Sequence, residues 1–166
     1  YIAMDFENLE YKSLPDIHRE EYRKHPIYGY TALKNEDWLS KTSKEIILCH
    51  HEQVDGNGYP LHASELSQEV KIAAVCDFFD EHICGIGCER MKVYEVVEFL
   101  KAAKDTVFDA KVIDTLLDFT AVYPSGSKVF TNEKETAIVI RQNKGFPERP
   151  VLQIVADKTG KILEEN

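Results

Sequence analysis

The sequence predicts a mainly α-helical fold, a bundle of about five helices, followed by a small antiparallel β part. Up to residue 122, apolar residues recur at helical spacing between breaker residues. From the YPSG turn at residues 123–126 onward, the pattern changes to an alternation rich in Val, Ile and Thr, which is typical of strands. We therefore predict two domains, a helical one over 1–122 and a β extension over 123–166.

The first helix is predicted over residues 17–33. Asp16 precedes it, and an aspartate at that position can accept hydrogen bonds from the free amides of the first turn. Pro26 interrupts the pattern, so we expect a kink or a helix boundary near His25. A second helix is predicted over residues 36–52, and the turn-forming sequence DGNGYP that follows it should end it.

The third helix is predicted over residues 67–83. Its middle, IAAVCDFF, is apolar on nearly every side, so we expect it to be central and buried. Two further amphipathic helices are predicted over residues 92–104 and 110–122. Turn signals divide the alternating segment after YPSG into three or four short strands.

Composition and charge limit the possible functions. The 20 basic and 29 acidic residues give a net charge of −9, which argues against nucleic-acid polymers as partners. No apolar run approaches the ~20 residues that cross a membrane, so we expect no membrane contact. The four cysteines are too few for a disulfide scaffold and indicate a reducing, cytoplasmic location. The chain opens with Tyr1, so we expect the natural N-terminus to be missing.

Polar chemistry is concentrated in three of the predicted helices. His25 lies at the proline kink, His50 and His51 end the second helix, and Asp77 lies inside the apolar third helix. Adjacent histidines on a helix point about 100° apart, so they can face two ions, or one ion and its ligand. A buried carboxylate such as that of Asp77 needs a partner, and a metal ion is a suitable one.

A plainer interpretation stays open at this point. His50 and His51 can be exposed at a helix C-terminus, where positive charge suits the helix dipole. Asp77 can bind a nearby backbone group or Lys71. Spacing alone does not decide between this interpretation and metal binding.

The string HHEQVDGNGYP at residues 50–60 matches the HHExxDGxGYP signature of the HD-GYP phosphodiesterases, a branch of the HD metal-dependent phosphohydrolases. HPIYGYTAL at 25–33 resembles the family's HPxxGYxxL, and KIAAVCDFFD at 71–80 resembles the family helix RIIAVADVFDAL. YPSGSKVF and NKGFPERPVLQIV resemble a β extension that follows many of these domains. The resemblance covers almost the whole chain, in the same order.

The resemblance implies a set of roles for individual residues. The implied metal ligands are His25, His50, His51 and Asp77; the implied bracing carboxylates are Glu52 and Asp55; and the implied substrate-contacting turn is Gly58, Tyr59 and Pro60. It also implies two or three iron or manganese ions, and hydrolysis of cyclic di-GMP to pGpG or GMP in bacterial signal transduction. The metals would supply the positive charge that the acidic chain lacks. GGDEF-type or other signalling proteins are the implied protein partners.

Three departures from the family pattern change these expectations. No histidine in the chain is followed by aspartate, whereas the family carries an HDxGK motif upstream of the HP histidine. We therefore expect the metal site to be incomplete, and hydrolysis to be absent, in this chain alone. The family's TSxRPYR loop is replaced by HICGIGCERMK at 82–92, where Arg90 and Lys92 are the candidate phosphate-binding residues. The family's FDAL has become FDEH at 79–82.

The cysteines allow a second metal hypothesis. His82, Cys84 and Cys88 could form a zinc or redox site, but their spacing is not that of a zinc knuckle, so a loop with buried thiols is favoured. Cys49 and Cys76 are expected to be small packing residues. Two functions are thus carried forward: a cyclic dinucleotide phosphodiesterase, and a catalytically degenerate HD-GYP module that acts as a nucleotide sensor or protein-interaction domain.

Overall fold

The computed structural model describes residues 20–163 with the exception of 86–87 and 145. The chain divides into two compact units, one ending at Asp114 and the other beginning at Thr115. The domain boundary after residue 122 stays a prediction. The N-cap role of Asp16 and the first residues of the first predicted helix fall outside the described residues.

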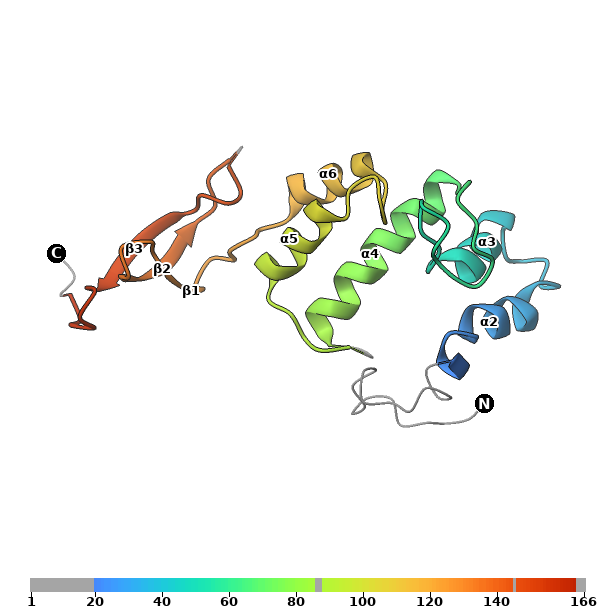
Figure 1. Ribbon diagram of the computed structural model, residues 1–166, viewed down its shortest axis with the longest axis horizontal. Coiled ribbons are helices and arrows are strands. Elements are labelled where there is room, and N and C mark those ends of the chain that lie inside the picture. Colours follow the sequence, from blue (N-terminus) through green and yellow to red (C-terminus); the bar gives the residue numbers. More distant parts are fainter. Residues whose placement is uncertain (1–19, 86–87, 145, 164–166) are drawn as a thin grey trace. The chain divides into compact units, whose positions relative to one another are not determined.

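The described residues form five helices and three strands (Figure 1). The helices are α2 (His25–Leu33), α3 (Lys41–Cys49), α4 (Gln68–Cys84), α5 (Val93–Ala102) and α6 (Ala110–Phe119). The strands are β1 (Lys128–Phe130), β2 (Thr136–Arg141) and β3 (Val151–Ala156). The predicted fold class, mainly α with a small antiparallel β part, is confirmed.

Helices α2 and α3 show how local capping sets the helix boundaries. Pro26 lies in the first turn of α2, where its missing N–H costs nothing, and the predicted boundary near His25 is confirmed. The prediction that the next helix starts at residue 36 was wrong. The Ser40 hydroxyl accepts the Ser43 N–H at 2.9 Å and caps the helix, so α3 starts at Lys41, directly after Ser40. Trp38, expected on the helix, is 73% exposed.

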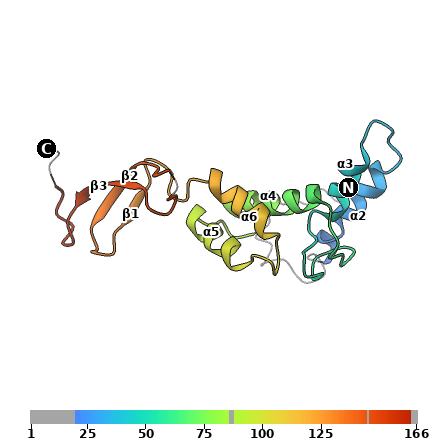
Figure 2. The same cartoon turned by 90° about the horizontal axis from the view of Figure 1, so that it is seen from above.

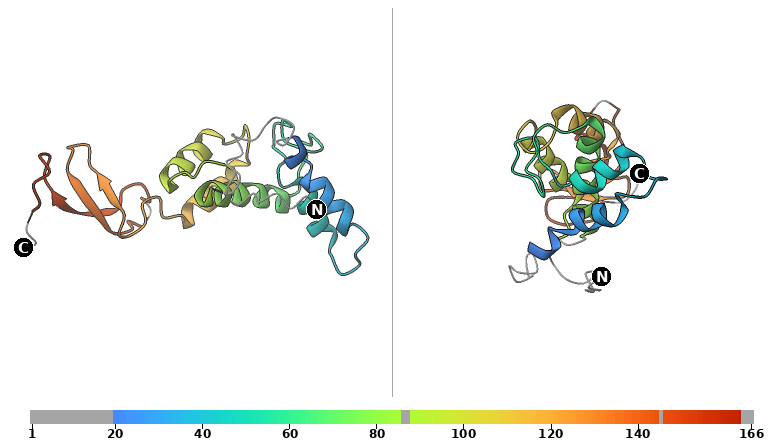
Figure 3. Two further views of the ribbon diagram at one scale, coloured as in Figure 1. Left: turned by 90° about the horizontal axis from the view of Figure 1, so that it is seen from below. Right: turned by 90° about the vertical axis from the view of Figure 1, so that its right-hand side faces the viewer.

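Helix α4 is the central helix of the first unit and contacts both α3 and α5. In Figure 1 and in the left view of Figure 3, α4 and α5 run side by side. Val70, Ala74 and Val75 of α4 are buried. The prediction that the whole middle of this helix is buried was wrong, because Ile72 is 46% exposed and Cys76 is also exposed. These two residues are one helical turn apart and lie on the same, partly exposed side of α4.

Capping residues define both ends of α4 and the start of α6. The Ser67 hydroxyl accepts the Val70 N–H at 3.5 Å, and Gly85 ends the helix in the left-handed conformation with φ of 75°. Asp109 accepts the N–H groups of Lys111 and Val112 at 3.0 and 3.2 Å and thus caps α6. Across the helices, Phe78 of α4 stacks on Phe99 of α5 with ring centroids 4.8 Å apart.

The second unit contains the antiparallel sheet β1–β2–β3 (Figure 2). Val129 lies opposite Ala137, and Ala137 lies opposite Ile154. Ala137 and Val139 are buried, whereas Phe130 and Ile140 are exposed, so the alternation seen in the sequence gives this small sheet one buried face. Across the described part of the chain, no helix combines the length and the apolar character that spanning a bilayer needs.

Candidate metal centre

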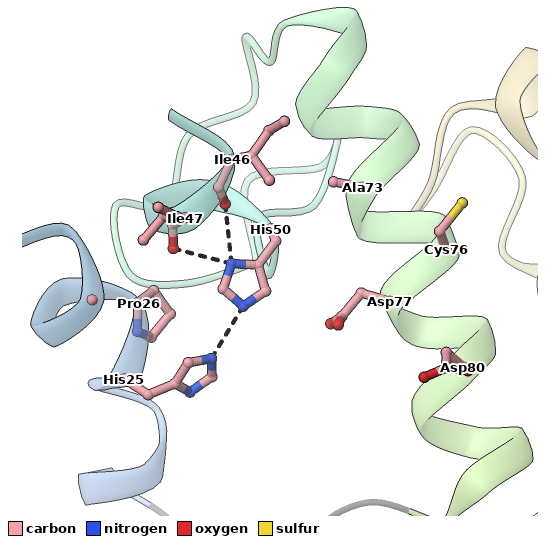
Figure 4. A pocket seen from close by; sticks show the side chains of 10 residues that line it. His25, Pro26, Ile46, Ile47, His50, Ala73, Cys76, Asp77 and Asp80 are labelled. Atoms are coloured by element: carbon pink, nitrogen blue, oxygen red, sulfur yellow. Dashed lines mark hydrogen bonds between the residues drawn. The ribbon is translucent and has the colours of Figure 1, made fainter. Parts of the chain in front are cut away.

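Three helices bring polar side chains to one open hollow (Figure 4). His25 is the first residue of α2, His50 directly follows α3, and Asp77 lies in the middle of α4. The hollow is lined by His25, Pro26, Gly29, Ile46, Ile47, His50, Ala73, Cys76, Asp77 and Asp80. Helices α2 and α3 approach closely at Gly29, where a Cβ would lie 3.2 Å from the Ile47 side chain.

Backbone hydrogen bonds fix the tautomers of His25 and His50. The Nδ1–H of His25 donates to the carbonyl of Tyr22 at 2.8 Å, and the Nδ1–H of His50 donates to the carbonyls of Ile46 and Ile47, both at 3.1 Å. In a neutral imidazole the proton sits on one nitrogen only. The lone pair of each ring is therefore on Nε2, in the orientation that metal-binding histidines use.

The two Nε2 atoms face each other at 3.1 Å (Figure 4). Two lone pairs repel at that distance, and a proton or a cation between them would relieve the repulsion. Burial lowers the pKa of His25, and the neighbouring His50 lowers it further, which disfavours a shared proton. Two imidazole nitrogens that ligate one ion at right angles, each at about 2.1 Å, are about 3 Å apart. The geometry of this pair fits a divalent metal ion.

His51 completes a group of three imidazoles. The His51 ring lies edge-on to the His25 ring, with centroids 4.9 Å apart. The centroids of the His51 and His50 rings are 4.3 Å apart. Burial, with added repulsion from the other two histidines, lowers the pKa of His51 to about 3. His51 is therefore neutral at ordinary pH, and its 3.7 Å approach to the Asp77 carboxylate is not an ion pair. A neutral imidazole is the form that ligates metal.

Asp77 is on the edge of this group and not in an apolar core as the sequence suggested. Its side chain is 37% exposed and points into the hollow. Burial raises the pKa of Asp77. The plainer interpretation, in which Lys71 pairs with Asp77, is wrong: the Lys71 ammonium lies 3.1 Å from Asp109 instead. The interpretation of the histidines as solvent-exposed is also wrong, because all three are half-buried and face one another.

Sequence reasoning missed Glu81. Its carboxylate lies with His51 and Asp77 in a second group, in which one ligand atom from each residue lies within 4.8 Å of the others. Burial, and then repulsion from Asp77, raises the pKa of Glu81 to about 7. The available signal was its position, one helical turn after Asp77, in the segment where the family's FDAL reads FDEH.

The loop after the histidines is held by Glu52. This side chain is 1% exposed, and its two carboxylate oxygens accept the N–H groups of Leu61 at 2.5 Å and Ala63 at 2.9 Å. The Tyr59 N–H also donates to the His51 carbonyl at 3.1 Å, so the loop folds back on the histidine pair. Asp55 accepts two hydrogen bonds from Asn57, at 2.9 and 2.8 Å, within the turn. These contacts tie the loop to the chain segment that carries His50 and His51.

The GYP turn places an aromatic ring against a histidine. Tyr59 stacks on His51 with centroids 4.6 Å apart and planes 22° apart, and Pro60 follows it in the turn. Gly58 is buried, and a Cβ there would lie 2.3 Å from the Gln53 nitrogen and 2.4 Å from Glu52 Cα. Gly58 is thus required for backbone packing. The substrate-binding roles of Gly58, Tyr59 and Pro60 stay predictions.

Gly58→Ala is expected to destabilise the protein by about 1–3 kcal/mol, because its Cβ would overlap backbone atoms that cannot move aside. Asn57→Ala, one residue earlier and exposed, is the matched control and should cost less than about 1 kcal/mol. Chemical denaturation followed by circular dichroism measures both free energies of unfolding. Equal stability of the two variants would contradict the close packing at Gly58.

One cation near the centre, Arg23, was not expected from the sequence. The Arg23 guanidinium lies over the Tyr59 ring, 4.6 Å from its centroid, and its charge also contributes to the lowered pKa of His51. Arg90 instead donates to the Ile83 carbonyl at 3.0 Å, and the Lys92 ammonium lies over Tyr94. Arg90 packs against Gly85 beyond the end of α4. The roles predicted for Arg90 and Lys92 stay untested by these contacts.

The cysteines do not form a second centre among the described residues. Neither group of possible metal ligands contains His82, Cys84 or Cys88. The expectation of buried thiols was wrong for Cys84, which is exposed at the end of α4, and Cys88 is half-buried. Cys49 is buried as a packing residue, as expected, whereas Cys76 is exposed and lines the hollow.

Comparison with known proteins identifies the family of this chain. The sequence profile of the HD domain family matches residues 6–112, which is more than half of the 166-residue chain. The chain therefore belongs to the HD domain family, and the predicted HD-superfamily phosphohydrolase domain is confirmed.

Several relatives carry names that specify a reaction. A cyclic di-GMP phosphodiesterase of Pseudomonas aeruginosa is 28% identical over 127 residues, which cover 73% of this chain and 30% of that protein. The cyclic di-GMP phosphodiesterase PdeB of Borreliella burgdorferi is 24% identical over 159 residues, covering 93% of this chain and 41% of that protein. A 3'3'-cGAMP-specific phosphodiesterase of Vibrio cholerae is 32% identical over 104 residues, which cover 58% of this chain and 19% of that protein. The chain spans less than half the length of each of these proteins.

Proposed function

We propose that this chain forms the metal-binding part of a phosphodiesterase that hydrolyses a cyclic dinucleotide. The observation that carries the proposal is the pair of Nε2 atoms of His25 and His50, 3.1 Å apart with both rings held in the metal-binding tautomer. Membership of the HD domain family supports it, as do relatives named for cyclic di-GMP or cGAMP hydrolysis.

The chain's own residues position the centre and shape access to it. The backbone carbonyls of Tyr22 and Ile46 orient His25 and His50, and neutral His51 adds a third nitrogen ligand. Glu52 fixes the loop that places Tyr59 against His51. A divalent ion held by these residues would supply Lewis acidity, an activated water, and positive charge for the phosphodiester oxygens. The finer assignment, two or three iron or manganese ions, belongs to the same proposal.

The substrate would be an anion, and Arg23 is placed to receive it. Its guanidinium is held against Tyr59 at the border of the histidine group, while the residue itself is exposed. A guanidinium can bind a phosphate through two parallel hydrogen bonds. We include Arg23 as a phosphate-binding residue, at the border of the histidine group beside Tyr59.

Arg23→Ala is expected to raise KM about tenfold or more, because a hydrogen bond to a charged group contributes about 1.5–3 kcal/mol. Its metal content should not change, since Arg23 is not a ligand. Arg90→Ala is the comparison variant and should leave KM within about twofold, because its guanidinium binds the Ile83 carbonyl. Steady-state kinetics with cyclic di-GMP, on the protein as its gene encodes it, measure both KM values. The reverse ranking would assign the phosphate-binding role to Arg90, as the sequence predicted.

The remaining assignments follow from the family. We propose a cytoplasmic signalling protein in bacteria, with GGDEF-type or other signalling proteins as partners. The helical domain would extend to residue 122, with the β extension after it.

A second candidate function is a catalytically degenerate module that binds a nucleotide or a partner protein without turnover. The observation that favours it is the segment at 82–92, where HICGIGCERMK replaces the family's arginine-containing loop and Arg90 is engaged with the backbone. Metal binding is expected in this case too, but substrate would not be hydrolysed.

Hydrolysis decides between the two candidates. The protein as its gene encodes it is stripped of metal, reloaded with Mn²⁺ or Fe²⁺, and incubated with cyclic di-GMP or 3'3'-cGAMP. Chromatography should show metal-dependent release of linear dinucleotide or mononucleotide. Binding of cyclic dinucleotide without product, in metal-loaded protein, would contradict the enzyme and favour the module.

A further inference from the structure

Glu81 has no role in the histidine group, yet its carboxylate lies against it. It follows Asp77 by one turn of α4, so both side chains leave the helix on the same side. One ligand atom each from His51, Asp77 and Glu81 lie within 4.8 Å of one another. Ligand atoms about 2.1–2.3 Å from a common ion lie within about 4.6 Å of each other, so small movements would bring all three into contact with one cation.

The surroundings of the two carboxylates leave their charge uncompensated. In the described part of the chain, neither Asp77 nor Glu81 pairs with a lysine or an arginine. The one hydrogen bond that Glu81 receives there comes from the neutral Tyr22 hydroxyl, at 3.3 Å. Two half-buried carboxylates side by side repel each other, and either protonation of one of them or a bound cation relieves this repulsion.

We propose that Glu81 is a metal ligand and that, with Asp77 and His51, it forms a second cation position beside the His25–His50 pair. The inference rests on the proposed function, because it needs a metal centre at the histidines. The resembling family helix carries alanine at this position, in FDAL, so the extra carboxylate belongs to this chain and not to the signature. Two carboxylates and one imidazole make this position richer in oxygen than the histidine pair, and such ligands suit Mn²⁺.

Manganese titration tests the inference in the protein as its gene encodes it. Metal-free protein is titrated with Mn²⁺, and the electron paramagnetic resonance signal of the free ion reports how many ions bind and how tightly. The test variants are Glu81→Gln, which keeps the size and an acceptor for Tyr22, and Glu81→Ala, which restores the family's residue. Asp80→Asn is the matched control, because Asp80 lines the hollow from the same helix but belongs to neither ligand group. Circular dichroism without metal verifies the fold of each variant.

We expect both Glu81 variants to lose one bound Mn²⁺ or to bind it about tenfold or more weakly, while Asp80→Asn matches the wild type. If the wild type binds Mn²⁺ and the Glu81 variants give the same titration curve, Glu81 is not a ligand and the proposed function stands. If the wild type itself binds no Mn²⁺, the metal centre and this inference fail together. The two failures are thus distinguishable from one titration.

Discussion

Replacing His50 by alanine is expected to remove tightly bound metal and to lower cyclic dinucleotide hydrolysis by about three orders of magnitude or more. His50 contributes one of the two facing Nε2 atoms, and its ring cannot turn to another role without breaking the Nδ1–H bonds to Ile46 and Ile47. The variant would leave His25 with no partner nitrogen at 3.1 Å. Metal content by atomic spectroscopy and initial rates of hydrolysis, on the protein as its gene encodes it, measure the two effects.

His62→Asn provides the control for this variant. His62 lies in the same loop region, is exposed, and belongs to neither ligand group. Its φ of 57° is one that asparagine adopts readily, so the exchange should not strain the backbone. The control should keep wild-type metal content and rate. A His50→Ala protein that is folded and retains both would remove the histidine pair from the mechanism.

The second large effect is expected on stability, from Glu52→Ala. This buried carboxylate accepts the backbone N–H groups of Leu61 and Ala63, and alanine would leave both donors without their partner. Both hydrogen bonds are part-buried, and a donor left unsatisfied where water cannot replace its acceptor costs about 1–3 kcal/mol, so the free energy of unfolding should fall by about 2–6 kcal/mol. Denaturation followed by far-ultraviolet circular dichroism measures it.

Two further variants make the Glu52 test specific. Glu52→Gln keeps the volume and one acceptor oxygen, so its loss of stability should be intermediate. Glu45→Gln changes an exposed glutamate of α3 and should stay within about 0.5 kcal/mol of the wild type. If Glu52→Ala unfolded at the same denaturant concentration as Glu45→Gln, the loop would not depend on these hydrogen bonds.

The parts of the site that the sequence could predict are those that a contiguous motif or a local signal specifies. His50, His51 and Glu52 stand together in one string, and Pro26 marks the boundary that puts His25 at a helix start. The motif does not say how their side chains are paired. That Glu52 binds the backbone at Leu61 and Ala63, and that Gly58 is packed on the chain, depends on how the loop folds back.

The parts that could not be predicted depend on packing between helices. Glu81 joins His51 only because α4 lies across the end of α3, and Arg23 reaches Tyr59 only because α2 starts beside the loop. The exposure of Ile72 and Cys76 likewise reflects which face of α4 the other described helices cover. Local spacing determines the side of a helix on which a residue lies, but not what that side meets.

The central claim is that a metal ion joins His25 and His50. Anomalous X-ray diffraction from crystals of the protein grown with Mn²⁺ tests it most directly, because the anomalous signal locates the ion without assumptions about its ligands. We predict a peak at about 2.1–2.3 Å from Nε2 of both histidines. Manganese-containing crystals in which the two Nε2 atoms stay close with no peak between them, or in which the imidazoles turn away from each other, would contradict it.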